Sequence, residues 1–119
     1  MNIEDYRKYC LSKKGVTESI PFPNLPDVLA FKVCGKMFTA TDITTFASFS
    51  IKCNPEIIDE LRATHPAMQE PSYFSKKHWS LVILDNSIPD KLLYEWLNTS
   101  YNLVIENLPK KAQLELQNS

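Results

Sequence analysis

The chain has 119 residues, of which 44% are hydrophobic and 23% charged, and its formal net charge is −1. These values are typical of one globular domain spanning residues 1–119, and they exclude a disordered or collagen-like chain. The near-zero charge excludes strong overall attraction to nucleic acid or to an acidic membrane. Only two glycines are present, so phosphate-binding loops that need several adjacent glycines are excluded as well.

The N-terminal segment lacks the apolar stretch of a secretion signal, because charges are spread through residues 1–15. No window approaches the roughly 18 consecutive apolar residues of a membrane-spanning helix. The three cysteines, Cys10, Cys34 and Cys53, are widely spaced and form no C-x-x-C pair. We therefore expect a cytoplasmic monomer with reduced thiols, no membrane association and no cofactor.

The first predicted element is a helix over residues 3–14. Asn2 is suited to cap it, acidic residues occupy its first turn, and Gly15 follows its last turn. A short strand over residues 16–20 comes next and is expected at a sheet edge. Three prolines within residues 21–27 then exclude a central strand.

Three strands are predicted in the next part of the chain. Residues 28–34 and 37–41 are rich in β-formers and predict a hairpin with its turn at Gly35-Lys36. Residues 45–52 alternate between two faces, which predicts a third antiparallel strand with one face in the core. One face holds Phe46, Ser48, Ser50 and Lys52, and the other holds Ala47, Phe49, Ile51 and Cys53.

A second helix is predicted up to about residue 64, because Asn54-Pro55-Glu56 combines a cap, an N1 proline and an early acid. Residues 65–77 contain two prolines and no clear period, which predicts a long loop or an irregular edge. Residues 78–84 form the strongest predicted strand, with Trp79, Leu81 and Ile83 opposite Ser80, Val82 and Leu84.

The longest predicted helix opens at Pro89-Asp90 and carries an apolar stripe as far as Leu108. Residues 109–119 are expected to form a polar tail or a short helix. The order of the elements predicts the α+β class, a twisted antiparallel sheet covered on one face by helices.

No motif of a catalytic or metal site is present. The chain lacks G-x-S-x-G, H-E-x-x-H and an EF-hand loop. His65 ends a predicted helix, where an imidazole suits the helix dipole, and we expect a structural role for it. For His78, a structural or surface role is favoured over ligand contact. We therefore expect neither an enzyme nor a metal site.

Lysines gather near the predicted strands. They are Lys32, Lys36 and Lys52 in or beside the first three of these strands, and Lys76 and Lys77 directly before His78 and Trp79. If these strands are neighbours, the lysines share one surface that can bind phosphates, with aromatic groups nearby for bases. The alternative interpretation is that the lysines are scattered over the surface and only increase solubility, and that the tryptophan lies in the core. Only Arg7 and Arg62 are arginines, which disfavours base reading.

Short motifs follow one another over residues 3–108. They are Phe22-Pro23, Phe31 to Phe38, Ile51 to Glu56, Lys76 to Trp79, and Ser100 to Val104. As an ordered set they resemble the MmcQ/YjbR-like family of small bacterial proteins, formerly called DUF419. The resemblance implies an α+β fold similar to that of CyaY and frataxin. It also implies DNA binding through a double-wing arrangement.

Carried over by position, the family's hairpin turn implies Lys36 as a DNA contact. Its lysine-histidine-tryptophan motif implies Lys76, Lys77, His78 and Trp79. Where family members often have P-F-G, this chain has Pro21-Phe22-Pro23, and the stiffer backbone argues against close ligand approach there. Frataxins bind iron on an acid-rich first helix, but here only Glu4 and Asp5 lie beside four basic residues, so iron is not expected.

The sequence therefore predicts a non-enzymatic DNA-binding protein. The contact residues are expected to be Lys32, Lys36, Lys52, Lys76, Lys77, His78 and Trp79. The alternative is a domain that binds a protein or a small ligand through the same surface or through the loop of residues 65–77.

Overall fold

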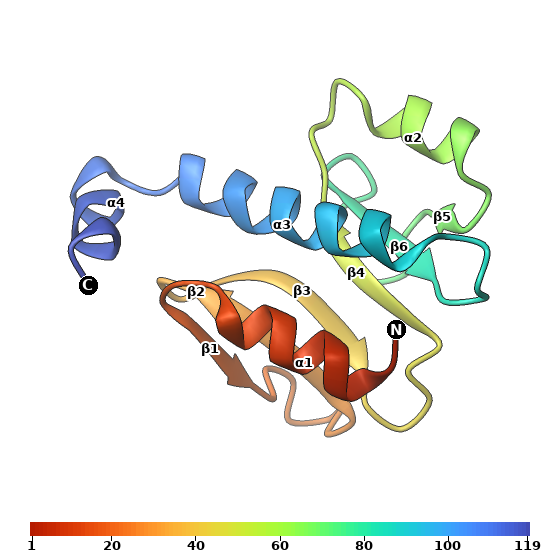
Figure 1. Ribbon diagram of the computed structural model, residues 1–119, viewed down its shortest axis with the longest axis horizontal. Helices are drawn as coiled ribbons and strands as arrows, with labels where there is room; N and C mark the ends of the chain where they lie inside the picture. The colour runs from red at the N-terminus through yellow and green to blue at the C-terminus, as the bar shows by residue number, and fades with distance from the viewer.

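The computed structural model describes residues 1–119 and contains four helices and a six-stranded antiparallel sheet. The strand order is β1-β2-β3-β4-β6-β5 (Figure 1). In chain order the elements are α1 (Ile3–Ser12), β1 (Val16–Ser19), β2 (Val28–Val33), β3 (Lys36–Asp42), β4 (Ser48–Lys52), α2 (Ile58–Thr64), β5 (Met68–Gln69), β6 (Trp79–Ile83), α3 (Asp90–Glu106) and α4 (Lys110–Gln117). The predicted α+β class is confirmed.

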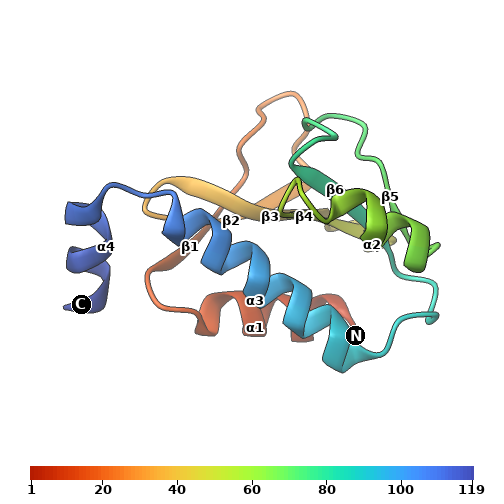
Figure 2. The ribbon, with the colours of Figure 1, turned by 90° about the horizontal axis from the view of Figure 1, so that it is seen from above.

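Helices cover only one face of the sheet. The α1 and α3 helices cross the same side, whereas the loops of residues 20–27 and 70–78 stand on the other side (Figure 2). Directly paired residues of neighbouring strands share a face, so the register assigns each side chain. The uncovered side is called the helix-free face, and its residues include Ser19, Ala30, Lys32, Ala40, Ser50, Lys52, Trp79 and Leu81.

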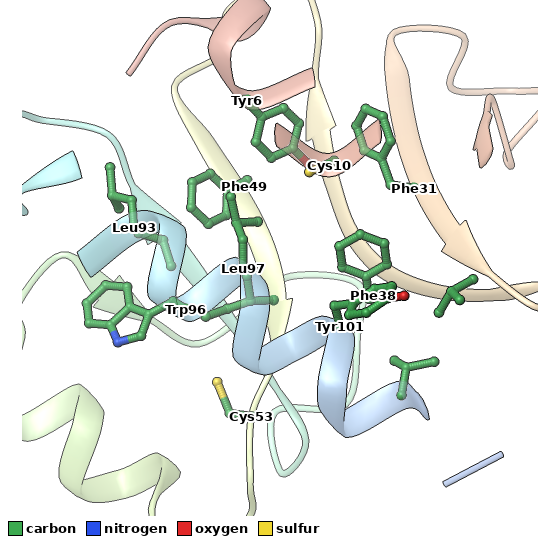
Figure 3. Close-up of a cluster of buried hydrophobic side chains, with 14 of the residues drawn as sticks. Tyr6, Cys10, Phe31, Phe38, Phe49, Cys53, Leu93, Trp96, Leu97 and Tyr101 are labelled. Atoms are coloured by element: carbon green, nitrogen blue, oxygen red, sulfur yellow. The ribbon is translucent and has the colours of Figure 1, made fainter. Parts of the chain in front are cut away.

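The core lies between the sheet and these two helices, and Tyr6 of α1 enters it beside Phe31 and Phe49 (Figure 3). The Tyr6 ring is centred 5.4 Å from the rings of both Phe31 and Phe49. Thr39 Oγ1 donates to the Ser50 carbonyl at 2.7 Å and lies 2.9 Å from the Tyr6 hydroxyl. Because threonine has one hydroxyl proton, Tyr6 is the donor to Thr39. Burial raises the pKa of Tyr6, so it remains a donor at neutral pH.

Ser100 of α3 holds β3 and β4 together where the two strands diverge. Their pairing ends at Thr39 and Ile51. Just beyond, Ser100 Oγ donates to the Phe38 carbonyl at 2.5 Å and accepts the Lys52 N–H at 2.8 Å. One fully buried hydroxyl thus satisfies a carbonyl and an amide that the ladder no longer pairs.

The β2–β3 turn is Cys34-Gly35, one residue earlier than the predicted Gly35-Lys36 turn. Both residues have positive φ, 50° and 77°, as a type I′ turn requires. Val33 and Lys36 are paired on either side of it. The prediction that Lys36 lies in the turn was therefore wrong, because Lys36 is the first residue of β3.

The predicted position of Phe46 was also wrong. The Asp42 carboxylate accepts the Thr44 N–H at 2.8 Å and organises a turn before β4. Phe46 then adopts φ of 41°, and its ring packs against Tyr6 instead of sharing a face with Ser48. The fourth strand consequently begins at Ser48, later than the alternation predicts.

The second helix is shorter than predicted. Asn54 Oδ1 accepts the Glu56 N–H at 2.9 Å, so this asparagine organises a turn and α2 begins only at Ile58. His65 caps the C-terminal end of α2 and packs edge-on against Trp96, with ring centres 5.0 Å apart. This contact is structural, as expected. No helix in the structure combines the length and the hydrophobicity that spanning a bilayer requires.

The C-terminal segment forms α4, the short helix that was one of two expectations for residues 109–119. Leu116 of α4 is buried and lies over Gly15. A Cβ at Gly15, where φ is 74°, would lie 2.4 Å from Leu116 Cδ1. At Gly35, where φ is 77°, a Cβ would meet nothing within 4 Å. Substitution at either glycine would strain the backbone, but only a side chain at Gly15 would also collide with a neighbour. Comparing the two substitutions therefore distinguishes these two costs.

We expect Gly15→Ala to destabilise the protein more than Gly35→Ala. Both substitutions force alanine into the left-handed region, which costs roughly 1–2 kcal/mol. Only the first also displaces Leu116 and the end of α4. The check is the urea midpoint of unfolding for both variants, and equal midpoints would contradict the packing of α4 on Gly15.

Candidate nucleic-acid interface

The structure brings most of the predicted contact residues to one end of the sheet. Lys32 and Lys52 are half-buried on the helix-free face, where Lys32 pairs with Met37 and Lys52 with Trp79. Lys36 is exposed at the start of β3. Because the strands are antiparallel, the ends of β2 and β4 lie beside the starts of β3 and β6.

A hollow of about 530 Å³ opens at this end of the sheet, where β3 and β4 diverge. Its strand side is formed by Lys36, Met37, Lys52 and Trp79, and its helix side by Val104, Asn107, Leu108 and Pro109 at the end of α3. We call it the lysine hollow. Two ammonium groups, those of Lys36 and Lys52, supply hydrogen-bond donors, so the hollow suits an anionic group such as a phosphate.

None of the predicted contact lysines is neutralised by a carboxylate. The structure contains two ion pairs, one between the Met1 amino group and Asp90 and one between Arg7 and Glu18. Neither involves a lysine. An unpaired ammonium group keeps its full charge for a ligand, so a local positive field exists despite the net charge of −1.

The turn of residues 75–79 is held by Arg62 of α2. Arg62 Nη2 donates to the carbonyls of Lys76 and Trp79 at 2.8 and 2.5 Å, and its Nε donates to Ser80 Oγ at 3.2 Å. The guanidinium therefore positions the turn through three hydrogen bonds from Nε and Nη2. This role of Arg62 was not predictable from the sequence, because its partners lie 14 to 18 residues away and match no motif.

The two remaining predicted residues differ in what they offer a ligand. Trp79 is half-buried and outside the core, so the alternative of a core tryptophan was wrong. Its ring stacks on Phe74, with centres 4.6 Å apart and an interplanar angle of 23°. The His78 side chain forms no hydrogen bond, whereas its carbonyl accepts the Cys53 N–H at 2.7 Å. The hydrogen bond that the structure shows for His78 therefore involves its backbone and joins the start of β6 to the end of β4.

A second hollow lies on the helix-free face between the two loops, with a volume of about 310 Å³. We call it the loop groove, and it is lined chiefly by Leu25, Ala40, Ser50, Tyr73, Phe74 and Leu81. The sequence indicated a functional loop at residues 65–77, but not that this loop and the loop of residues 20–27 line one groove. The proline-stiffened loop of residues 20–27, where close ligand approach was not expected, contributes Leu25 to the lining.

The family model described as YjbR matches residues 11–103. The chain belongs to the YjbR family. The YjbR protein of Escherichia coli K12 is 30% identical to this chain over 114 residues, covering 95% of each. YbdF of Escherichia coli O157:H7 is 27% identical over 106 residues, which are 84% of this chain and 87% of that protein.

Two solved structures have a similar fold. The crystal structure of Deinococcus radiodurans DR2400, a DUF419 domain, has a TM-score of 0.89 and 36% identity, and covers 98% of this chain and 88% of that one. A crystal structure of a Pseudomonas syringae protein has a TM-score of 0.74 at 22% identity, with 87% and 98% covered. The second match shows the fold alone. The family predicted from the ordered motifs is confirmed.

We expect Arg62→Ala to destabilise the protein clearly, because hydrogen bonds to a partly buried charged group contribute about 1.5–3 kcal/mol. Arg7→Ala is the matched control, since it removes the exposed pair with Glu18 and should change stability little. Urea unfolding of both variants checks this. Similar midpoints for the two variants would contradict the role assigned to Arg62.

Proposed function

We propose that this member of the YjbR family binds DNA without catalysis, through the lysine hollow and the turn of residues 75–79. The observation that carries the proposal is the pair Lys36 and Lys52 in one hollow with Trp79, with no carboxylate partner. Lysines position a phosphate backbone, and an adjacent aromatic ring suits a base. Lys32 pairs with Met37, which lines the hollow, and Lys76 and Lys77 precede Trp79 in the chain, so we include all three in the proposed contact surface.

The distribution of acids supports the same orientation of the ligand. Most acidic residues lie on helices: Glu4 and Asp5 on α1, Asp59 and Glu60 on α2, Asp90, Glu95 and Glu106 on α3, and Glu115 on α4. The α3 helix carries three acids and one lysine, so its surface attracts phosphates less than the lysine end of the sheet does. A net charge near zero is thus compatible with a directed electrostatic interaction.

Binding should be weak and strongly salt-dependent. Each phosphate neutralised adds about 0.9 to the slope of log K against log salt for duplex DNA. The experiment is a titration of labelled duplex, followed by fluorescence anisotropy, at about 50 mM and about 200 mM salt. The wild type is compared with the triple variant Lys36→Ala, Lys76→Ala and Lys77→Ala, in which all three substituted side chains are exposed.

We expect the triple variant to bind more weakly and to lose up to about 2.7 units of slope, because three phosphate contacts disappear. The matched control is Lys8→Ala, Lys14→Ala and Lys91→Ala, which removes the same charge from exposed positions on or next to the helices. The control should retain the wild-type slope. Equal binding by both triple variants would show that total charge, and not this site, attracts the DNA.

The second candidate function is binding of a protein or a small ligand at the loop groove. The specific observation in its favour is a hollow of about 310 Å³ with apolar walls, within the usual range for small-ligand sites of about 300–1,000 Å³. It is distinguished from DNA binding by capture of partners from lysate treated with nuclease. Partners lost on nuclease treatment support DNA binding, and partners retained support this second function.

A further inference from the structure

We propose that the loop groove holds an unpaired base of a DNA strand whose phosphates lie at the lysine hollow. This inference rests on the proposed function and adds a ligand class to it, because it requires single-stranded DNA to be preferred over duplex. The carrying observation is that the two hollows are neighbours along β4, and that Phe74 of the loop groove stacks on Trp79 of the lysine hollow.

The two hollows are adjacent along β4. Ser50 lines the loop groove and Lys52 lines the lysine hollow. They lie two residues apart on the helix-free face, which is about 7 Å along a strand. Phe74 lines the groove, and the Trp79 ring on which it stacks lines the lysine hollow. A ligand with an anionic group in one hollow can therefore place a flat group in the other.

Charged residues in the two hollows determine which end of such a ligand lies in which hollow. Asp42 lines the loop groove, and Lys36 lines the lysine hollow. They are the two ends of β3, six residues and roughly 20 Å apart. A phosphate is repelled at the Asp42 end and attracted at the Lys36 end. The backbone of a strand consequently lies at the lysine end, and only an uncharged part reaches into the groove.

The lining of the groove matches a nucleobase. Leu25, Tyr73 and Phe74 form apolar walls, and the hydroxyl of Ser50 lies in the floor. Tyr73 is 83% exposed and Leu25 is 41% exposed, so large side chains stand on both rims of the same groove without a partner. Stacking of a base on such rings tolerates any sequence, because every base has a flat π-face.

The groove also discriminates between single and double strands. It is recessed between the loops of residues 20–27 and 70–78, which rise above the sheet (Figure 2). The faces of a base in duplex DNA are covered by its neighbours. A duplex must therefore unstack and flip a base before the groove can receive it, whereas a single strand needs no such step.

The experiment compares three labelled ligands of equal length in the same buffer: a thymidine oligomer, an abasic deoxyribose-phosphate oligomer and a duplex. Anisotropy titrations use the wild type, Tyr73→Ala and Tyr73→Phe. The matched control is Ile57→Ala, another large exposed side chain, 44% exposed and outside both hollows. Because Tyr73 is exposed, its truncation leaves the core intact, and circular dichroism verifies the fold.

We expect wild type to bind the thymidine oligomer more tightly than the other two ligands. Tyr73→Ala should weaken this binding about 5- to 100-fold, the loss of stacking on one ring, and leave the duplex and abasic affinities unchanged. Tyr73→Phe and Ile57→Ala should bind like wild type. If all three ligands bind equally and Tyr73→Ala has no effect, the base site is refuted while the lysine site stands. If none of them binds, the proposed function fails as well.

Discussion

One buried hydroxyl, Ser100 Oγ, determines how the lysine end of the sheet is built. It bonds to Phe38 on β3 and to Lys52 on β4, just where those strands stop pairing with each other. Without it, a buried carbonyl and a buried amide would lack partners, at a cost of about 1–3 kcal/mol for each group. With it, the strands can separate, and the gap they leave becomes the lysine hollow next to α3.

The sheet has two chemically different faces because helices cover only one of them. The covered face holds the aromatic core around Tyr6, and the α1 and α3 helices that cover it carry five of the 14 acidic residues. On the helix-free face, small residues such as Ala40 and Ser50 lie beneath two loops, and Lys32 and Lys52 lie towards one end. A net charge of −1 therefore conceals an arrangement in which one end of the sheet is positive.

Local patterns in the sequence predicted much of the fold. Apolar spacing gave the buried stripe of α3, alternation gave β6, and Asn2 was identified as the cap of α1. Contacts between distant segments were not predictable, because they leave no periodic signal. Three contacts are of this kind. Arg62 donates hydrogen bonds to the turn before β6, Leu116 packs over Gly15, and two loops distant in the sequence line one groove. Lys36 and Lys52 could be named as candidates from the sequence because they are charged. That they line one hollow depends on the strand order, which the sequence does not show.

The most direct test of the account is a titration of isotope-labelled protein with a DNA strand, followed by amide chemical shifts in NMR spectra. The account predicts shifts at Lys36 and Met37, at Ser50 to Cys53, and at residues 72–79, with α1 unaffected. Shifts confined to α1 and to the first turns of α3 would contradict it, because those segments line neither the lysine hollow nor the loop groove.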